Sequence, residues 1–439
     1  MKHDVSKKRT VPAQGAPVPV SAVPRGAISL GSFWTLITGA LARISGIDRS
    51  WSRQELRALG SACLAHVLHD GYTDLLYLLF PIWQREFGLS FALVGMMKTA
   101  FSGTLSLFQI PAARLSERFG ERVILPAGTV LIGSAVLLYG FAQSSTALFV
   151  LLLAGGLGAG VQHPLASNVV ARAFRNSRNA LAVYNFAGDA GKVLLPSAAA
   201  LLIALFGWRT ALWPLALAGI FLGFALFWLI PADEMPKPEA GPSNTAALAG
   251  DGAIRRGFRS LTAIGILDNA TRTAFLTFMP LLLSQKGAAP ATIGTALSLI
   301  FAGGAAGKFA CGMLAERLGV TRTVVVTEVL TAACIASFLI LPLDAVFLLL
   351  IPLGIALNGT SSVLYGTVAE LAPGSRRAHA YAVFYTASLG AGAIAPLLFG
   401  MIADRVDLPV TLFAVASMAL FTVPLALLLA KQRSLPCTP

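Results

Sequence analysis

The chain has 439 residues, of which 56% are hydrophobic and only 12% are charged, and its mean hydropathy is +0.74. Soluble domains carry roughly 25% charged residues, so this composition excludes a soluble globular protein and indicates an integral membrane protein. The formal net charge of +13 does not indicate nucleic-acid binding, because the positive residues fall in alternate loops between apolar segments. The four cysteines are scattered and predict neither a disulfide framework nor a metal knuckle.

The first 57 residues are predicted to form a cytoplasmic tail. Residues 1–26 are basic and rich in proline, which is typical of a disordered segment. Residues 27–47 are apolar but are interrupted by Arg43. We interpret them as a helix that lies on the membrane surface rather than as a cleaved signal peptide.

Twelve apolar segments follow, and each is long enough to cross a bilayer, since about 20 residues span the hydrocarbon core. Short polar or Gly/Pro breaks separate most of them, but residues 231–257 form a longer break rich in proline, glycine and charge. This break is predicted to be a cytoplasmic linker between an N-terminal half (58–230) and a C-terminal half (258–431), with 432–439 as a cytoplasmic tail. The segments are 58–82, 90–113, 122–142, 146–170, 178–206, 209–230, 260–284, 290–315, 321–341, 345–370, 379–402 and 408–430.

The charges of the loops predict the orientation in the membrane. Positive residues gather in the loops after the even-numbered segments, and by the positive-inside rule these loops and both termini are cytoplasmic. The positive residues of these loops are Arg114, Arg118, Arg122, Arg172, Arg175, Arg178, Lys237, Arg255, Arg256, Arg259, Arg317, Arg322, Arg376, Arg377, Lys431 and Arg433, against only Arg85, Arg209, Lys286 and Arg405 in the opposite loops.

The two halves resemble each other at an offset of 199 to 200 residues. ARLSERFG (113–120) recurs as GMLAERLG (312–319), and Pro196 in the fifth segment aligns with Pro396 in the eleventh. A repeat of this size predicts a transporter of two halves with its binding site at their interface. A channel is the rival interpretation, but no segment resembles a selectivity filter.

The repeated octapeptide resembles the loop motif of the major facilitator superfamily, G-x-L-a-D-R-x-G-R-K, which lies between the second and third helices of each half. Ala113 and Glu121 depart from it, and glutamate replaces its aspartate in both copies. The resemblance implies an all-α integral membrane fold with twelve transmembrane helices in two pseudo-symmetric six-helix halves. It also implies a cytoplasmic gate at the matching residues, Glu117, Arg118, Gly120, Gly312, Glu316, Arg317 and Gly319.

Three further stretches resemble the fosmidomycin-resistance branch of drug exporters. They are AHVLHDGYTDLLYLLFPI (65–82), GVQHP (160–164) and YNFAGDAG (184–191).

The first segment carries an unusual polar face. His66, Asp70 and Asp74 are spaced i, i+4, i+8, and His69 lies one position away. A carboxylate beside an imidazole can exchange protons near neutral pH, so His66, Asp70 and Asp74 are predicted to couple transport to protons. A buried, hydrogen-bonded seam that fixes helix packing is the alternative. His69 and Tyr72 are assigned to the substrate cavity.

Other ionisable or polar residues of the segments are also predicted to line the cavity, because charges inside a membrane span mark function. Helical spacing predicts ion pairs Asp189–Lys192 and Asp268–Arg272. Lys98 and Lys308 are expected to reach the membrane surface, and Glu328 in the ninth segment has no assigned role. The remaining cavity residues are His163, Asn185, Asp189, Lys192, Asp268, Asn269 and Arg272.

These features predict a secondary transporter of the inner (plasma) membrane and not an enzyme. No Walker sequence is present, so ATP is not the expected driver. We predict proton-coupled export, by antiport and alternating access, of a small polar or anionic organic compound or drug. The chain is expected to work as a monomer in the lipid bilayer, without a cofactor, a resident metal or nucleic acid.

Three alternatives stay open. The first is proton-coupled uptake of a metabolite. The second is transport of a transition metal through the His/Asp face of the first segment, since imidazole and carboxylate suit such metals. The third is a receptor that does not transport, which the ionisable residues in both halves disfavour.

Overall fold

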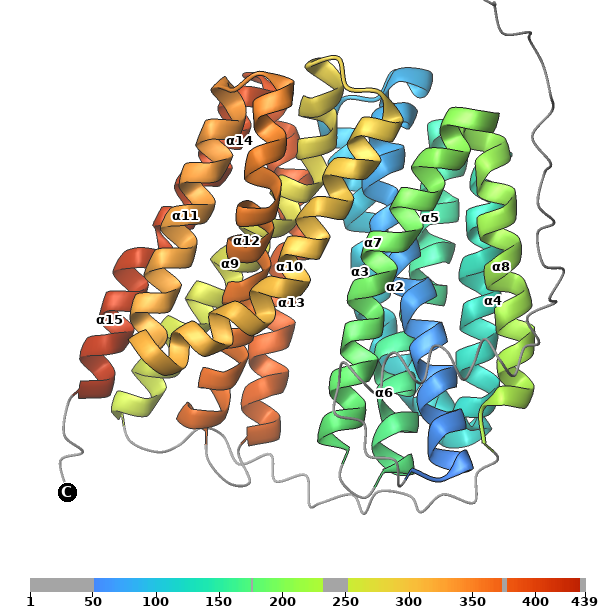
Figure 1. The fold of residues 1–439 in the computed structure, drawn as a ribbon, viewed down its shortest axis with the longest axis horizontal. Helices are drawn as coiled ribbons and strands as arrows, with labels where there is room; N and C mark the ends of the chain where they lie inside the picture. The colour runs from blue at the N-terminus through green and yellow to red at the C-terminus, as the bar shows by residue number, and fades with distance from the viewer. Residues whose placement is uncertain (1–50, 175–176, 232–251, 373–376, 435–439) are drawn as a thin grey trace, which may run out of the picture. The chain divides into compact units, whose positions relative to one another are not determined.

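A computed structural model describes residues 51–174, 177–231, 252–372 and 377–434, and every regular element in these residues is an α-helix (Figure 1). The predicted N-terminal tail up to residue 50, including the surface helix at 27–47, lies outside the described residues. The same is true of most of the predicted linker and of the last five residues.

The helices follow the predicted segments closely. The fourth span is broken at Gly160 and Val161 into α5 and α6, and the last span is broken at Phe421 into α14 and α15. The helices are α2 (Arg53–Phe87), α3 (Phe91–Phe119), α4 (Glu121–Tyr139), α5 (Ser145–Ala159), α6 (Gln162–Ala173), α7 (Arg178–Phe206), α8 (Trp208–Leu229), α9 (Gly252–Gln285), α10 (Pro290–Leu318), α11 (Val320–Ile340), α12 (Leu343–Leu371), α13 (Arg377–Ala403), α14 (Leu408–Leu420) and α15 (Thr422–Ser434).

Ten spans in the described residues are long and apolar enough to cross a bilayer, with α5–α6 and α14–α15 each counted as one. α2 and α9 are also long enough to cross a bilayer, at 35 and 34 residues, but their charged residues make them less apolar than the other ten spans. They are the first helices of the two halves, so the spans number twelve. The two least apolar spans are therefore equivalent helices of the repeat.

Two of the motif glycines adopt backbone angles that other residues avoid. Gly120 and Gly319 end α3 and α10 with φ of 80° and 82° and ψ of 151° and 157°, a region essentially restricted to glycine. Gly312, by contrast, has no positive φ, and a Cβ there would meet open space. The first half already carries Ala113 at the equivalent position.

α2 packs closely against α7 and α6 within the N-terminal half, as α9 packs against α13 and α12 within the other (Figure 1). The close approach of α2 and α7 depends on glycine. A Cβ at Gly188 would collide with the His66 imidazole, and one at Gly191 would collide with the Val67 carbonyl. These two glycines therefore set how near the polar face of α2 lies to α7.

The halves contact each other through α3 with α13, α7 with α10, and α2 with α9. We call the side of the bundle with the Arg-rich loops the basic end, and the other side the opposite end. At the opposite end, Arg85 donates to the Ser284 carbonyl over 3.1 Å, and Asp404 accepts from the backbone N–H groups of Phe91 and Ala92. Within the described ranges, no hydrogen bond joins the halves at the basic end.

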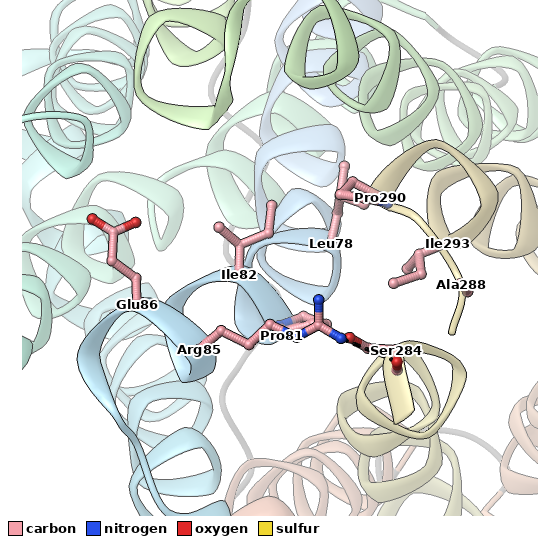
Figure 2. A pocket seen from close by; sticks show the side chains of 9 residues that line it. All are labelled: Leu78, Pro81, Ile82, Arg85, Glu86, Ser284, Ala288, Pro290 and Ile293. Carbon is pink, nitrogen blue, oxygen red and sulfur yellow. Dashed lines mark hydrogen bonds between the residues drawn. The ribbon is translucent and has the colours of Figure 1, made fainter. Parts of the chain in front are cut away.

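A cavity of about 390 Å³ lies at the opposite end, between α2 and the α9–α10 turn. Figure 2 shows Arg85 extending toward Ser284 beside it, with Pro290 and Ile293 on the other wall. Its only charged lining residues are Arg85 and Glu86. The ionisable groups predicted to act in transport lie elsewhere, toward the middle of the helices.

Candidate functional site

Asp70 of α2 is the centre of a buried ionisable cluster. One carboxylate oxygen lies 3.3 Å from His66 Nε2 and 3.4 Å from Lys192 Nζ of α7, and the other lies 3.7 Å from His163 Nε2 of α6. The Asp70 side chain is only 10% exposed. A carboxylate buried in this way requires charged or hydrogen-bonding partners, and here three helices supply them.

The hydrogen-bond partners of His66 show that the His66–Asp70 contact needs a proton. Its Nδ1 is 2.8 Å from the Tyr184 carbonyl oxygen. A carbonyl only accepts, so Nδ1 carries hydrogen and donates to it. In a neutral ring, Nε2 would then present a lone pair to the Asp70 carboxylate, which also only accepts. The His66–Asp70 contact therefore calls for one proton, held either on the ring or on the carboxyl group.

A second carboxylate extends the cluster across the two halves. Lys192 lies 3.8 Å from Asp189, as the helical spacing predicted, and Lys308 of α10 contacts both Asp189 oxygens at 2.7 Å. Among the hydrogen bonds between the halves in the described residues, Asp189–Lys308 lies nearest the basic end. The chain of charges thus runs from α2 through α7 into the C-terminal half.

The nitrogen groups of the cluster are more accessible than its carboxylates. The side chains of His163, Lys192 and Lys308 are 49%, 29% and 39% exposed, against 10% and 11% for Asp70 and Asp189. All five are joined to one another in the middle of membrane-spanning helices. The exposed groups therefore present positive charge and imidazole to a solvent-accessible face, which suits an anionic or polar ligand.

Asp74 and Lys98 are buried one step further along α2 and α3. The Lys98 ammonium lies 4.3 Å from the centre of the Tyr77 ring, an arrangement that stabilises a desolvated cation. Asp74 lies beyond ion-pair distance of every described cation, but Lys192, Lys98 and Arg272 act on it electrostatically. The expectation that Lys98 reaches the membrane surface is wrong, because only 2% of this residue is exposed.

In the C-terminal half, Asn269 of α9 hydrogen-bonds both to α13 and to Arg272. Its amide donates to the Ser388 carbonyl of α13, which leaves its oxygen to accept from Arg272 over 2.8 Å. The predicted Asp268–Arg272 ion pair is therefore replaced by an Asn269–Arg272 hydrogen bond. Asp268, one position around the helix, is buried and hydrogen-bonds to Glu328 of α11 instead.

Three residues assigned to the cavity from sequence lie apart from the Asp70 cluster. His69 faces α4, where Nε2 donates to the Thr129 hydroxyl, which itself donates to the Leu125 carbonyl. Tyr72 donates to the Leu215 carbonyl of α8. Asn185 is exposed one helical turn from Asp189, toward the basic end. His69 and Tyr72 differ from the prediction because each residue step turns a side chain about 100° around the helix, and they lie one and two steps from Asp70.

The motif residues Glu117, Arg118, Glu316 and Arg317 are exposed at the basic end. The departure from the motif at Glu121 has a structural reason. Its carboxylate is buried, lies 3.0 Å from Arg172 and accepts from the Asn168 amide, so it ties α4 to α6.

Sequence reasoning missed two members of the ionisable network. Lys308 was expected to reach toward the basic end, which is wrong because it binds Asp189. Glu328 had no predicted role, yet it contacts Asp268. A signal was available for both, since a charge inside an apolar span needs a partner, but spacing along one helix cannot identify a partner on another.

One group of side chains could hold a metal ion. Donor atoms of His66, Asp70 and His163 lie within 4.8 Å of one another. His69 and Asp74, which the metal alternative also used, are not in this group. The Lys192 ammonium, 3.4 Å from the same Asp70 carboxylate, would repel a divalent cation there.

Comparison with known proteins decides the family. The model of the Major Facilitator Superfamily matches residues 62–267 and 261–436. The chain belongs to the Major Facilitator Superfamily. As a superfamily member it is a multi-pass membrane transporter and not an enzyme.

Individual relatives are more distant. The chain is 26% identical to the fosmidomycin resistance protein of Escherichia coli (strain K12), over 81% of this chain and 89% of the relative. It is 25% identical to a probable sulfoacetate transporter of Cupriavidus necator, over 80% and 88%. A solved bacterial homologue of the human lysosomal transporter Spinster, in an inward-facing and unoccupied conformation, has 15% identity and a TM-score of 0.73 over 87% of this chain and 98% of that one.

Proposed function

We propose that this superfamily member exports a small polar or anionic organic compound in exchange for protons, by alternating access. The observation that carries the proposal is the His66–Asp70 contact, which calls for a proton at the centre of a cluster that also holds Lys192 and His163. The relatives named for fosmidomycin resistance and for sulfoacetate support a compound of this chemical class.

The mechanism rests on competition at Asp70. A substrate with a hydrogen-bond donor would bind the ionised carboxylate, while its anionic group would bind the accessible Lys192 and Lys308 ammonium groups. A proton on Asp70 removes the acceptor and so excludes that substrate. Substrate leaves when a proton arrives, which is how exchange is coupled.

The proposal extends to topology. The basic end is cytoplasmic, which places both termini and the predicted linker there and places the chain in the inner membrane. The halves (58–230 and 258–431) then move about the central cluster as a monomer, with the motif residues Glu117 and Glu316 acting in a gate at the basic end. Because the hydrogen bonds between the halves in the described residues lie at the opposite end and the middle, this topology implies an inward-facing conformation.

The test uses the full chain in proteoliposomes with an imposed pH gradient and fosmidomycin as the probe. Wild-type flux should follow the pH gradient, and Asp70→Asn should abolish that dependence. Asp344→Asn, at an exposed carboxylate in the first turn of α12, is the matched control. Unchanged pH-driven flux in Asp70→Asn would refute Asp70 as the coupling site. A drug-susceptibility panel on expressing and deletion cells tests export, and no change in potency for any compound would count against it.

Proton-coupled uptake is a second candidate because of the Asp70–Lys192 contact. Protonation of Asp70 would free Lys192 for an anion, so that substrate and proton bind together. The pH dependence of probe affinity separates the two schemes. Under exchange, affinity rises with pH, because the ionised carboxylate is the binding form. Under co-transport it falls with pH.

Metal transport is the remaining candidate, because the donor atoms of His66, Asp70 and His163 are close enough together to bind one ion. Calorimetric titration of the purified chain with Zn²⁺ tests it. We expect no binding to the wild type because of Lys192, and binding to wild type that His163→Ala abolishes would revive this candidate.

A further inference from the structure

Glu328 is a buried carboxyl group for which proton coupling at Asp70 gives no role. It lies on α11, is 2% exposed, and belongs to a helix with no other acidic residue. An ionised side chain at this position would be costly inside a membrane span. Something close by must therefore stabilise or neutralise it.

Its partner is another carboxyl group. The side chains of Glu328 and Asp268 hydrogen-bond to each other across α11 and α9, and Asp268 is 5% exposed. The Thr360 hydroxyl of α12 also lies beside Glu328, and it donates to Thr327. The two acids thus meet inside the C-terminal half, on a different set of helices from the Asp70 cluster.

Two ionised carboxylates can only accept hydrogen bonds, so a hydrogen bond between them requires a proton on one. Loss of that proton would leave two like charges in contact in a region of low dielectric, which is why such pairs share a single proton. The geometry therefore specifies a pair with one bound proton and one negative charge.

The surrounding groups fit a single negative charge. Arg272 on α9 is the cation that acts on Asp268, and it donates to Asn269 rather than to either acid. Tyr365 of α12 also faces Asp268. The ring of Tyr385 of α13 stacks on the Tyr365 ring, with 4.7 Å between the ring centres. α14, which packs on both α9 and α11, carries no ionisable residue.

The pair also borders a small polar cavity. Asp268, Asn269, Arg272 and Ser388 line it, and its volume of about 10 Å³ is close to what one water molecule needs. The Ser388 hydroxyl is buried and has no hydrogen-bond partner among the described residues. A water molecule in this space would bond that hydroxyl and Asp268, and it could accept a proton from the pair, which the Arg272 guanidinium cannot.

We propose that Asp268 and Glu328 form a second proton-binding site, in the C-terminal half, which holds one proton at neutral pH and exchanges it with solvent. The proposal rests on proton-coupled transport, and it gives the cycle a proton site that is independent of Asp70.

Infrared spectroscopy of the full chain in liposomes tests this site directly, because the C=O stretch of a protonated carboxyl group is separate from that of a carboxylate. Wild type should show the protonated band at neutral pH, and the band should shift when H₂O is replaced by D₂O. Glu328→Gln should lose it, because the Gln amide donates to Asp268 in place of the shared proton and leaves Asp268 ionised beside Arg272. Asp344→Asn, at an exposed carboxylate, should keep it.

Three results would overturn the proposal: no protonated band in wild type, no such band in the difference spectrum between wild type and Glu328→Gln, or a band in that difference that does not shift in D₂O. A folded Glu328→Gln variant is verified by gel filtration. Asp268→Asn serves as a second variant that should keep a protonated band, because it leaves the buried Glu328 with no cation beside it. Asp70→Asn separates this proposal from the coupling proposal. If its flux still follows the pH gradient while the band behaves as expected, coupling at Asp70 fails and the second site stands.

Discussion

His66 and its equivalent in the repeat, Gly265, show how the two halves diverged at single positions. In the N-terminal half, Gly188 leaves room for the His66 imidazole. In the C-terminal half the glycine is on the other helix. Ser388 occupies the position of Gly188, and the Phe384 ring and the Ser388 hydroxyl fill the space where a Cβ on Gly265 would point. Each half fills the same space between two helices, but only the first half fills it with a titratable ring.

The charges diverged in the same way. Asp70 of the first half is Asn269 in the second, and Lys192 is Gly392, which packs on the Asn269 amide. The Asp70–Lys192 ion pair between α2 and α7 thus corresponds to a packing contact between Asn269 and Gly392, on α9 and α13. The sequence repeat predicted that Asp70 and Asn269 correspond, but the correspondence of Lys192 and Gly392 gains meaning only once their contacts are known.

The two motif glycines of the second half should respond oppositely to alanine. Gly319→Ala is expected to cost about 1–3 kcal/mol, because a side chain is strained at φ of 82° and ψ of 157°. Gly312→Ala should be neutral or slightly stabilising, since its Cβ meets open space in a helix. Thermal unfolding in detergent measures both. Equal unfolding temperatures for the two variants would contradict the backbone argument.

The Tyr77 ring should stabilise the buried Lys98 ammonium. A cation over a desolvated ring gains about 2 kcal/mol, so Tyr77→Leu should be less stable than Tyr77→Phe, which keeps the ring. The difference should disappear in a Lys98→Met background. Unfolding of the four proteins in detergent gives the coupling energy, and a coupling near zero would show that the ring acts only by packing.

At the scale of the helices, the sequence predicted most of the fold. Apolar length and Gly/Pro breaks located most spans to within a few residues. The exception is α9, which begins at Gly252, so the predicted linker (231–257) and the predicted span (260–284) were bounded too late. The linker and the repeat, and not the polarity of single spans, divided the chain into halves. The position of the break in the fourth span was less predictable. The helix is interrupted at Gly160 and Val161, and Pro164 lies in the first turn of α6.

The candidate site was predicted only in part, because helical periodicity resolves one helix at a time. It brought His66 and Asp70 onto one face, and it placed Asp189 beside Lys192. It could not show that α10 turns Lys308 toward Asp189, nor that α11 turns Glu328 toward Asp268. Such contacts depend on the rotation of one helix against another, which packing of small residues such as Gly188 determines.

The packing of α2 on α7 predicts a compensating pair of substitutions. Gly188→Ser should displace the His66 ring and cost about 1–3 kcal/mol from overpacking. Adding His66→Gly should recover most of that loss, because the double variant reproduces the Gly265–Ser388 pair of the other half. Gly103→Ser, where a Cβ meets open space, is the control for a helical glycine. The argument fails if His66→Gly makes the Gly188→Ser protein less stable still.

At the scale of the whole molecule, the two halves are joined by contacts at the opposite end and by contacts nearer the basic end. Asp404 joins the end of α13 to the first N–H groups of α3, where the helix dipole favours a negative charge. Asp189–Lys308 joins the halves nearest the basic end. Alternating access requires that the contacts at the opposite end break while the basic end closes, so the Asp404 contact should set the balance between the two conformations.

Asp404→Ala is therefore expected to shift the population toward the outward-facing conformation. Loss of two charge-assisted hydrogen bonds at an exposed site should change the equilibrium by about 1–2 kcal/mol, which is roughly 5- to 30-fold. Asp407→Ala is the matched control, because this carboxylate caps α14 through Val410 N–H within one half and costs local stability only.

Spin labels on the exposed positions Leu115 and Met313, near the basic ends of α3 and α10, report the change as a distance distribution. In wild type the distance of the inward-facing conformation should dominate. Asp404→Ala should enlarge a shorter-distance population, and Asp407→Ala should not. If both variants left the distribution unchanged, the contact at α3 would not control the equilibrium. If both changed it alike, the effect would come from helix ends in general and not from the bond between the halves.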